Sequence, residues 1–494
     1  MKTRDAQWVA GLCVLAAVLR FSTLGVQSFG EDEAFTVLLS RDSFGGLGDR
    51  LLLESTPPLY FVLVWVWGQV FGTDEAGLRS LSALCGTLAV PAVWWAGRAL
   101  LERRAALIAA AIFAVNPLLV WYGQEARSYA LVVLLATVGF GFFARALGDE
   151  NRSRALAGWA VMSALALCTH YFALFVVVPE AAWLVARVRP RRLAVFAAAV
   201  PAATLAALYP LVHDQRNPST GWTRKWTIPD DEPLLDRVVQ IPREALAGYA
   251  APAGRVFATV LGLLVLFGLV LLVTRATPAQ RRGAGIAATV AATALAIPIG
   301  AALTGSDSDY VLTRFFLAAG APCALIVAAG LAATRGGRLA AVALCALSLP
   351  LVVAVAADSR YQRPDIGGAV RSIDEGAPPR AVLVIGRARQ YVEAYLPGVR
   401  DFPSAGAGVS EVDIVILPLP GRTRPPRFVT PRPPPGFALA QRTVTHTYAT
   451  LRYRPATARL LTTDDVTNAL VDLPAALRRR VSHVVLEFPA RRAA

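Results

Sequence analysis

Long apolar segments recur along the chain from Trp8 to Ala357, separated by short polar or arginine-bearing breaks. Their lengths, about 17 to 25 residues, match what a helix needs to cross roughly 30 Å of hydrocarbon. Because backbone polar groups find no other partners in lipid, we interpret these segments as transmembrane helices. Residues 8–24 lack a small-residue cleavage site and are predicted to be a retained span rather than a signal peptide.

One apolar segment, Pro57–Phe71, is ambiguous because it is short for a span and opens with two prolines. If it crosses the membrane, four arginine-rich loops lie outside. If it lies along the outer interface, with Trp65 and Trp67 at headgroup depth, those loops lie inside with the N-terminus. We predict the second arrangement, in which the inner loops are 98–104, 187–192, 275–283 and 335–338.

This choice predicts about eleven spans, with the N-terminus inside and the C-terminus outside. The transmembrane domain would comprise residues 1–357 and include a long first outer loop at 27–78. The expected spans lie near 8–24, 79–100, 105–121, 128–146, 155–171, 172–188, 193–212, 253–274, 284–304, 313–333 and 338–357.

After Asp358 the pattern changes to short apolar runs, AVLVIG, VDIVILPL and VSHVVLEF, separated by helical patterns and a proline-rich stretch at 418–435. Such spacing predicts a small α/β domain at 358–494. The predicted fold class is therefore an α-helical polytopic membrane protein with a small C-terminal α/β extracytoplasmic domain.

Composition agrees with a membrane protein, because 55% of the 494 residues are hydrophobic and the mean hydropathy is +0.50. The net charge of +15 would fit a nucleic-acid-binding protein. However, the arginines lie in short loops and form no basic stripe interleaved with aromatics, so we expect no nucleic-acid partner. The five cysteines fall singly in apolar segments and support neither a disulfide framework nor a zinc site.

The first outer loop is acidic in a basic protein. Residues 27–57 contain six carboxylates and two arginines, including the consecutive Glu31, Asp32 and Glu33. An ordinary acidic loop, in which Asp32 caps a short interfacial helix, would explain this. Neighbouring side chains on a helix project about 100° apart, so we expect one carboxylate to face a substrate while its neighbour orients or caps.

Two further polar clusters are predicted at outer ends of spans. NPLLVWYGQEARSY presents Gln124, Glu125, Arg127 and Tyr129, and SDSDYVLTRFF places Arg314 just inside a span with Tyr310 one turn before it. An arginine at that depth needs an anionic partner, either a lipid phosphate or a carboxylate such as that of Glu125.

Two aromatic motifs have both a structural and a functional interpretation. His170 in CTHYFAL lies at a predicted outer turn and is more simply explained by packing than by catalysis. Trp222 and Lys225 in GWTRKW could stack on a sugar and contact a phosphate, or anchor the loop at the interface.

Several ordered motifs carry a family resemblance: GEDEAFT, STPPLYFVL, LRSLSALCGTLAVP, GRALLERRAALIAAAIFAVNPLLVWYGQEARSYAL, THYFAL and YVLTRFFLAAGAP. They resemble the polyprenyl-phosphate-dependent glycosyltransferases of the C superfamily, family 39 and its bacterial relatives, which include protein O-mannosyltransferases and lipid A aminoarabinose transferases. The resemblance covers the first half of the chain, resumes near Tyr310 and does not extend to the C-terminal domain.

The resemblance implies a bacterial plasma-membrane enzyme that moves a sugar from a lipid phosphate in the outer leaflet to an acceptor outside. The essential Asp-Glu pair of that family matches Asp32 and Glu33. Before the PPL turn, where relatives often have histidine or lysine, this chain has Thr56 with Glu54 nearby. The family's short interfacial helix also matches Pro57–Phe71.

The residue types fit an inverting displacement of a lipid phosphate. Cations must hold the departing charge, and a base opposite the leaving group must take the acceptor's proton. We expect Asp32 to be the base, with Glu33 second. The expected phosphate ligands are Arg127, Arg314 and Lys225, and the expected substrate contacts are Glu54, Gln124, Glu125, Tyr129, His170, Trp222 and Tyr310. The acidic loop could also hold a divalent cation, although no metal-ligand spacing is present.

Two other classes of function remain open. A transporter or flippase of lipid-linked sugars usually has repeated halves and ionisable residues near mid-membrane, whereas here the charges gather at span ends and no internal repeat is visible. A non-catalytic scaffold for cell-envelope assembly would make the C-terminal domain the functional part.

The predicted topology is tested with single cysteines in a variant that lacks the native five. Asp74→Cys and Arg400→Cys should react with an impermeant thiol reagent added to sealed cells, because both positions are expected outside. Glu102→Cys should stay unlabelled, because it lies in an inner loop. Labelling at Glu102 would overturn the placement of every later loop.

Overall fold

The computed structural model describes residues 3–148, 151–215, 233–304, 310–374, 380–385, 389–396, 399–403, 405–417, 433–457, 459–467 and 483–488. The chain divides into two compact units. The helical unit comprises Met1–Leu24 and Leu39–Ala354, and the sheet unit comprises Gly25–Leu38 and Val355–Ala494. The start of the first outer loop is therefore grouped with the C-terminal region.

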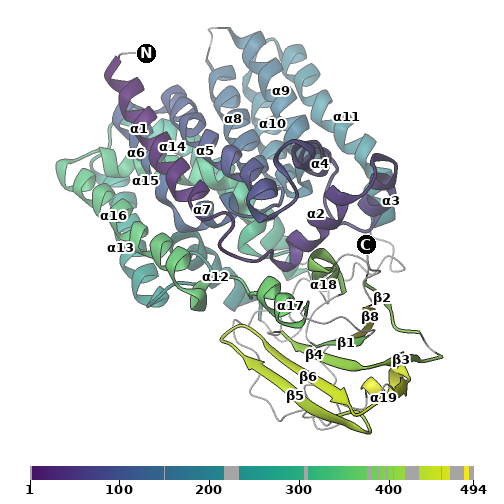
Figure 1. The fold of residues 1–494 in the computed structure, drawn as a ribbon. Coiled ribbons are helices and arrows are strands. Elements are labelled where there is room, and N and C mark those ends of the chain that lie inside the picture. The colour runs from purple at the N-terminus through teal and green to yellow at the C-terminus, as the bar shows by residue number, and fades with distance from the viewer. Residues whose placement is uncertain are drawn as a thin grey trace. The chain divides into compact units, whose positions relative to one another are not determined.

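Each predicted span coincides with a helix or with two consecutive helices (Figure 1). These are α1 (Thr3–Phe21), α5 (Glu75–Leu100), α6 (Arg103–Val115), α7 (Pro117–Gly123), α8 (Tyr129–Ala146), α9 (Arg152–Thr169), α10 (Leu174–Arg187), α11 (Arg191–Gln215), α13 (Gly254–Thr274), α14 (Pro278–Leu303), the 3-10 helix η5 (Thr313–Ala319) continued by α15 (Gly320–Ala332), and α16 (Arg335–Ala357).

Seven helical segments in the described part of the chain are long and apolar enough to cross a membrane, or eight if α6 and α7, bent by 57°, form one span. Three of the predicted spans, α1, α9 and α10, are helices that are shorter or less apolar than this. The prediction of an α-helical polytopic membrane protein is confirmed.

Short helices form the first outer loop and one later connection. They are α2 (Glu31–Arg41), η1 (Phe44–Gly46), α3 (Leu47–Leu52), α4 (Leu59–Phe71) and α12 (Leu234–Ala247). With 13 residues, α4 reaches only about 20 Å. The indoles of Trp65 and Trp67 donate to the Asp42 carbonyl and the Ser80 hydroxyl at 3.0 and 2.8 Å. The interfacial position of this helix stays a prediction.

The core of the helical unit alternates large aromatic residues with alanine and glycine. Trp159, Phe113, Phe140 and Phe143 are almost fully buried among alanines of α5, α6, α8, α14 and α15. Small residues let the helix backbones approach closely, as in other membrane proteins. A Cβ on Gly330 of α15 would overlap the backbone oxygen of Gly268 in α13, so the crossing of these two helices requires glycine.

Arg20 lies buried where α1 meets the break between α6 and α7. Its guanidinium donates to the carbonyl oxygens of Phe113 and Ala114 at 2.9 Å, the last carbonyls before the chain turns at Pro117. A proline prevents α6 from continuing and leaves those carbonyls without intrahelical donors. A Cβ on Gly86 would lie 2.8 Å from Arg20 Nε, so α5 also packs directly against this side chain.

The sheet unit is a mixed α/β domain, which confirms the predicted class. Its strands are β1 (Arg380–Ile385), β2 (Arg400–Asp401), β3 (Ala407–Val409), β4 (Glu411–Ile416), β5 (Phe437–Val444), β6 (Ala449–Pro455), β7 (Arg459–Leu461) and β8 (His483–Phe488). The main sheet has the order β2-β8-β1-β4-β6-β5, and β3 pairs with β7. β1 and β4 are parallel, and the other pairs are antiparallel.

Three short helices complete this unit: α17 (Ile366–Asp374), α18 (Arg389–Tyr395) and α19 (Thr463–Thr467). The sheet also buries charge, because Arg452 of β6 forms a two-pronged ion pair with Asp413 of β4, at 2.8 and 3.2 Å. These two residues are direct cross-strand partners. A shift of one residue would separate the charges, so the pair fixes the strand register.

Arg20→Met tests the joint between α1, α6 and α7. Methionine keeps much of the volume but removes the donors, so we expect the free energy of unfolding to fall by about 2–4 kcal/mol. Thermal unfolding in detergent measures the change. Arg4→Met, at the exposed start of the same helix, should cost no more than about 0.5 kcal/mol; equal losses in both variants would contradict the structural role of Arg20.

Candidate functional site

The carboxylates of Asp32 and Glu33 have different surroundings at the start of α2. Glu33 is fully buried, and its Oε2 accepts a hydrogen bond from the Gly30 backbone N–H at 2.7 Å. Because Gly30 immediately precedes the helix, Glu33 supplies the carboxylate half of a capping box. Asp32 is partly exposed. The pair therefore divides into a buried cap and a neighbour that solvent can reach.

The C-terminal region of the sheet unit binds the chain just before α2. Ser28 donates to Asp365 Oδ1 at 2.6 Å, and the Phe29 N–H donates to the Tyr395 hydroxyl at 2.6 Å. Nε of Arg363 lies 3.7 Å from Glu33 Oε2. We call Arg363, Asp365 and Tyr395 the α2 clasp.

A second acidic residue of the first outer loop is already committed to a cation. Nε of Arg50 donates to Asp42 Oδ2 at 2.5 Å. This hydrogen bond holds the pKa of the Asp42 carboxyl below its usual value. Asp42 therefore stays ionised and bound to Arg50, which makes it a poor candidate for a base.

In the helical unit, Arg127 and Glu54 form a buried two-pronged ion pair. The two Nη atoms of Arg127 donate to the two carboxylate oxygens of Glu54 at 2.8 and 3.1 Å. The guanidinium also lies 5.5 Å from the centre of the Phe61 ring in α4. Of the two kinds of partner expected for Arg127, a carboxylate is present, but it belongs to Glu54 rather than Glu125.

Gln215, at the end of α11, holds the segment that carries Glu54. Its Nε2 donates to the carbonyl oxygens of Leu51 and Thr56, at 2.8 and 3.2 Å. Its Oε1 accepts a hydrogen bond from the Tyr171 hydroxyl at 2.8 Å. These bonds join residues more than 150 positions apart, and no sequence pattern indicated them.

Aromatic rings connect most of the other expected residues of the helical unit. The His170 ring lies 5.5 Å from Tyr129 and 6.0 Å from Phe315. Tyr310 reaches the same group through Phe172, which lies 5.2 Å from it and 5.3 Å from His170. We call these five residues the aromatic cluster.

The aromatic cluster is close to both arginines of the helical unit that were expected to bind phosphate. The charges of Arg127 and Arg314 both act on the His170 imidazole. Nδ1 of His170 accepts from the Phe172 N–H at 3.3 Å, whereas Nε2 has no hydrogen-bond partner among the described residues. Packing on three sides supports the structural interpretation of His170, and Nε2 is its remaining polar atom.

The other expected residues of the site differ in their surroundings. Gln124 is structural, because its amide donates to the Leu19 and Arg20 carbonyls and to the Thr23 hydroxyl. Glu125 is buried and acts electrostatically on Tyr122. Lys225 and Trp222 lie outside the described residues. Within the described residues, no group of three or more His, Cys, Asp and Glu side chains could hold a metal ion.

Tyr122 and Tyr249 were not expected in the site. Their hydroxyls are 2.5 Å apart, and the Tyr122 ring lies 4.6 Å from Tyr129. Tyr122 follows the proline-aromatic shoulder NPLLVWY, which is the only signal in the sequence that pointed to it. Tyr249 follows α12 and has no such signal.

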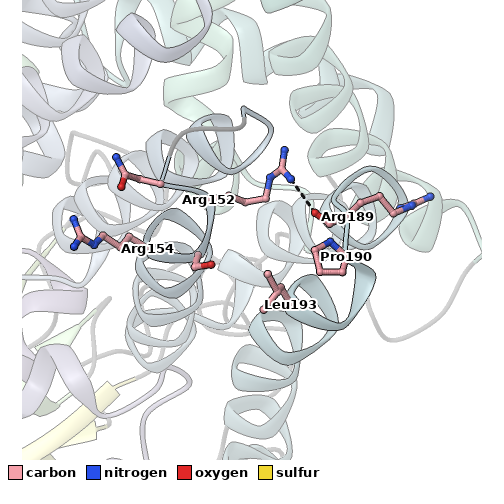
Figure 2. Close-up of a pocket in the computed structure, with 7 residues that line it drawn as sticks. Arg152, Arg154, Arg189, Pro190 and Leu193 are labelled. Carbon is pink, nitrogen blue, oxygen red and sulfur yellow. Dashed lines mark hydrogen bonds between the residues drawn. The ribbon is translucent and has the colours of Figure 1, made fainter.

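A shallow depression of about 440 Å³ lies between the N-terminal ends of α9 and α11, lined by Asn151, Arg152, Ser153, Arg154, Arg189, Pro190 and Leu193. In Figure 2 the guanidinium groups of Arg152, Arg154 and Arg189 point in different directions rather than toward one position. The depression lies at the opposite end of α9 from His170, about 27 Å away along an 18-residue helix. It is separate from the aromatic cluster.

Residues 55–213 match the family model described as dolichyl-phosphate-mannose-protein mannosyltransferase. The match confirms the resemblance to lipid-phosphate-dependent glycosyltransferases. The matched segment starts next to Glu54 and includes Arg127, Tyr129 and His170. The predicted enzyme class, a glycosyltransferase, agrees with the description of this family.

Solved structures similar to this chain include three membrane enzymes. They are the oligosaccharyltransferase AglB from Archaeoglobus fulgidus (13% identity, TM-score 0.48, 76% of this chain and 58% of that chain), ArnT from Cupriavidus metallidurans (13%, 0.47, 91% and 98%) and the arabinofuranosyltransferase AftD from Mycobacteria (17%, 0.43, 91% and 41%). The chain thus spans 58% of the length of the archaeal protein. No curated protein sequence matches it.

Paired variants test whether Arg127 binds a lipid phosphate as well as Glu54. Arg127→Ala should weaken binding of a polyprenyl-phosphate sugar by about 1.5–3 kcal/mol if a charge-assisted bond is lost. Glu54→Gln keeps an acceptor of similar size and should change donor affinity by less than about 2-fold. Arg127→Lys should restore binding only in part, because lysine lacks the planar fork. Equal donor affinity in Arg127→Ala and Glu54→Gln would leave Arg127 with a structural role only.

Proposed function

We propose that this protein is a membrane glycosyltransferase that moves a sugar from a polyprenyl-phosphate donor to an acceptor at the outer face. The observation that carries the proposal is the division of roles at the start of α2. Glu33 is used as a buried cap, which leaves Asp32 as the carboxylate of the pair that an acceptor can approach. The family match of residues 55–213 supports the same reaction class.

The proposed reaction is an inverting displacement. An oxygen of the acceptor, which we take to be a hydroxyl, attacks the anomeric carbon as the bond from that carbon to the phosphate oxygen breaks. The proton of the acceptor passes to Asp32, and the polyprenyl phosphate leaves with the bonding electron pair. Phosphate is already a good leaving group, so the protein needs to supply cations more than a strong acid.

Among those cations, we assign the larger share of phosphate binding to Arg314. Glu54 already accepts hydrogen bonds from both Nη atoms of Arg127 and offsets much of its charge. Arg314 lies in η5, directly before Phe315 of the aromatic cluster. A phosphate beside it would receive a guanidinium, the side chain best matched to planar oxyanions.

The orientation follows from the same reaction. In our proposal the N-terminus and the arginine-rich loops are cytoplasmic, and residues 358–494 form an extracytoplasmic domain of a bacterial plasma-membrane protein. The acceptor is then a glycan, lipid or protein of the cell envelope. The rings of Tyr129, His170 and Tyr310 provide flat surfaces suited to a sugar or a prenyl chain.

Asp32→Asn tests the proposed base. Asparagine keeps the size and the capping ability of aspartate, so the protein should fold, insert and bind the donor. Single-turnover transfer from a synthetic polyprenyl-phosphate sugar should fall by at least about 10²-fold, the lower end of what a positioned base contributes. Donor binding should be recorded in the same preparation.

Controls for this variant come from the same loop. Asp49→Asn, at an exposed position of α3, should leave transfer unchanged, and Glu33→Gln should have an intermediate effect because glutamine can still accept from Gly30. Near-normal transfer by Asp32→Asn would sink the catalytic assignment. Loss of donor binding together with transfer would instead indicate that Asp32 holds the donor or a metal ion. Sugar transport without release of free polyprenyl phosphate would favour a flippase.

A further inference from the structure

The segment that leads into α2 is bound on several sides by residues more than 330 positions later in the chain. Besides the two hydrogen bonds of Ser28 and Phe29, the Arg363 N–H donates to Gln27 Oε1 at 3.1 Å. The Gly367 N–H, at the start of α17, donates to the Ser28 hydroxyl at 3.0 Å. Asp365 accepts from both Ser28 and the Gly368 N–H, which joins this segment to the N-terminal end of α17.

Arg363 differs from the other clasp residues because it contacts the helix itself. Its side chain and that of Glu33 are only 6% and 1% exposed. Its stem also packs on the first turn, because a Cβ on Gly30 would lie 3.2 Å from Arg363 Cδ and 3.3 Å from Glu33 Oε2. A buried carboxylate needs a nearby cation, and Arg363 supplies it where α2 begins.

From this arrangement we propose that Arg363 is a positioning residue for sugar transfer. By holding Glu33 and packing on Gly30, it fixes the first turn of α2 and therefore the direction in which Asp32 points. This inference rests on the proposed function of Asp32. It gives the C-terminal domain a role in the reaction: the domain sets the geometry of the base rather than only stabilising the fold.

The energetic argument is one of alignment. Asp32 and Glu33 are consecutive on one helical turn, so a shift of one moves the other. A displacement of about 1 Å between reacting groups can lower a rate by about 10²-fold even when binding is unchanged. A purely structural ion pair would instead change stability, and its loss would not affect turnover separately from donor binding.

The test compares three variants with a matched control in the full-length protein. Arg363→Ala removes the cation and the stem, Arg363→Lys keeps the charge, and Tyr395→Phe removes only the hydroxyl that binds the Phe29 N–H. Arg360→Ala is the control, because Arg360 is exposed and pairs with Asp358 three residues before Arg363. Two readouts are recorded: single-turnover transfer with donor binding, and amide hydrogen exchange in α2.

We expect Arg363→Ala to exchange the amides of residues 34–37 at least about 10-fold faster than the unmodified protein. Transfer should fall by about 10- to 100-fold while the donor Kd changes by less than about 2-fold. Arg363→Lys should recover most of the rate, and Tyr395→Phe should shift both readouts in the same direction by a smaller factor. Arg360→Ala should match the unmodified protein in both.

Three results would overturn the proposal. Unchanged exchange in α2 would show that Arg363 does not hold the helix. Faster exchange with normal transfer would show that the position of α2 does not limit the reaction. Equal losses of donor binding and transfer in Arg363→Ala, with no recovery in Arg363→Lys, would indicate a structural role alone. Failure of the proposed function is distinguishable, because then the unmodified protein would transfer no sugar while the exchange measurement would still report on the clasp.

Discussion

Charged side chains inside an apolar protein are tolerated only where partners within the protein satisfy them, and the main features of this structure follow from that requirement. Arg20 takes up carbonyls left open where a proline stops α6. Arg127 and Glu54 satisfy each other and thereby tie α8 to the first outer loop. Glu33 is buried at the start of α2 because the Gly30 N–H and Arg363 meet its carboxylate. Each pairing joins segments that local propensity alone would leave unconnected.

The same requirement separates residues of identical type into different roles. Glu33 and Asp32 are adjacent carboxylates, yet one is enclosed and the other is partly exposed. Arg127 and Arg314 both act on His170, yet only Arg127 is matched by a two-pronged carboxylate within the helical unit. Chemical type therefore narrows the candidates for a role, and burial with a specific partner decides between them.

Run length and spacing predicted the helices and strands well, because crossing hydrocarbon and pairing in a sheet both impose a regular period. The charge contrast around Asp32 likewise identified α2 before its surroundings were known. The contacts that refine the site were not predictable in this way. Gln215 holds the segment before α4, and Tyr395 reaches Phe29 across 366 positions. A single sequence carries no signal for pairings at such separations, and so residues 25–38 were not assigned to the C-terminal unit.

The buried position of Arg20 has a consequence for how the protein is made. Its acceptors on α6 lie 93 and 94 residues further along the chain. At a synthesis rate of about 5–20 residues per second, roughly 5–20 s pass before those carbonyls exist. During that interval α1 carries an unsatisfied guanidinium, which is costly in the bilayer core and drawn toward the interface or the translocation channel. Final seating of the first helix is therefore a late step of biogenesis, completed only after α5 and α6 have been inserted.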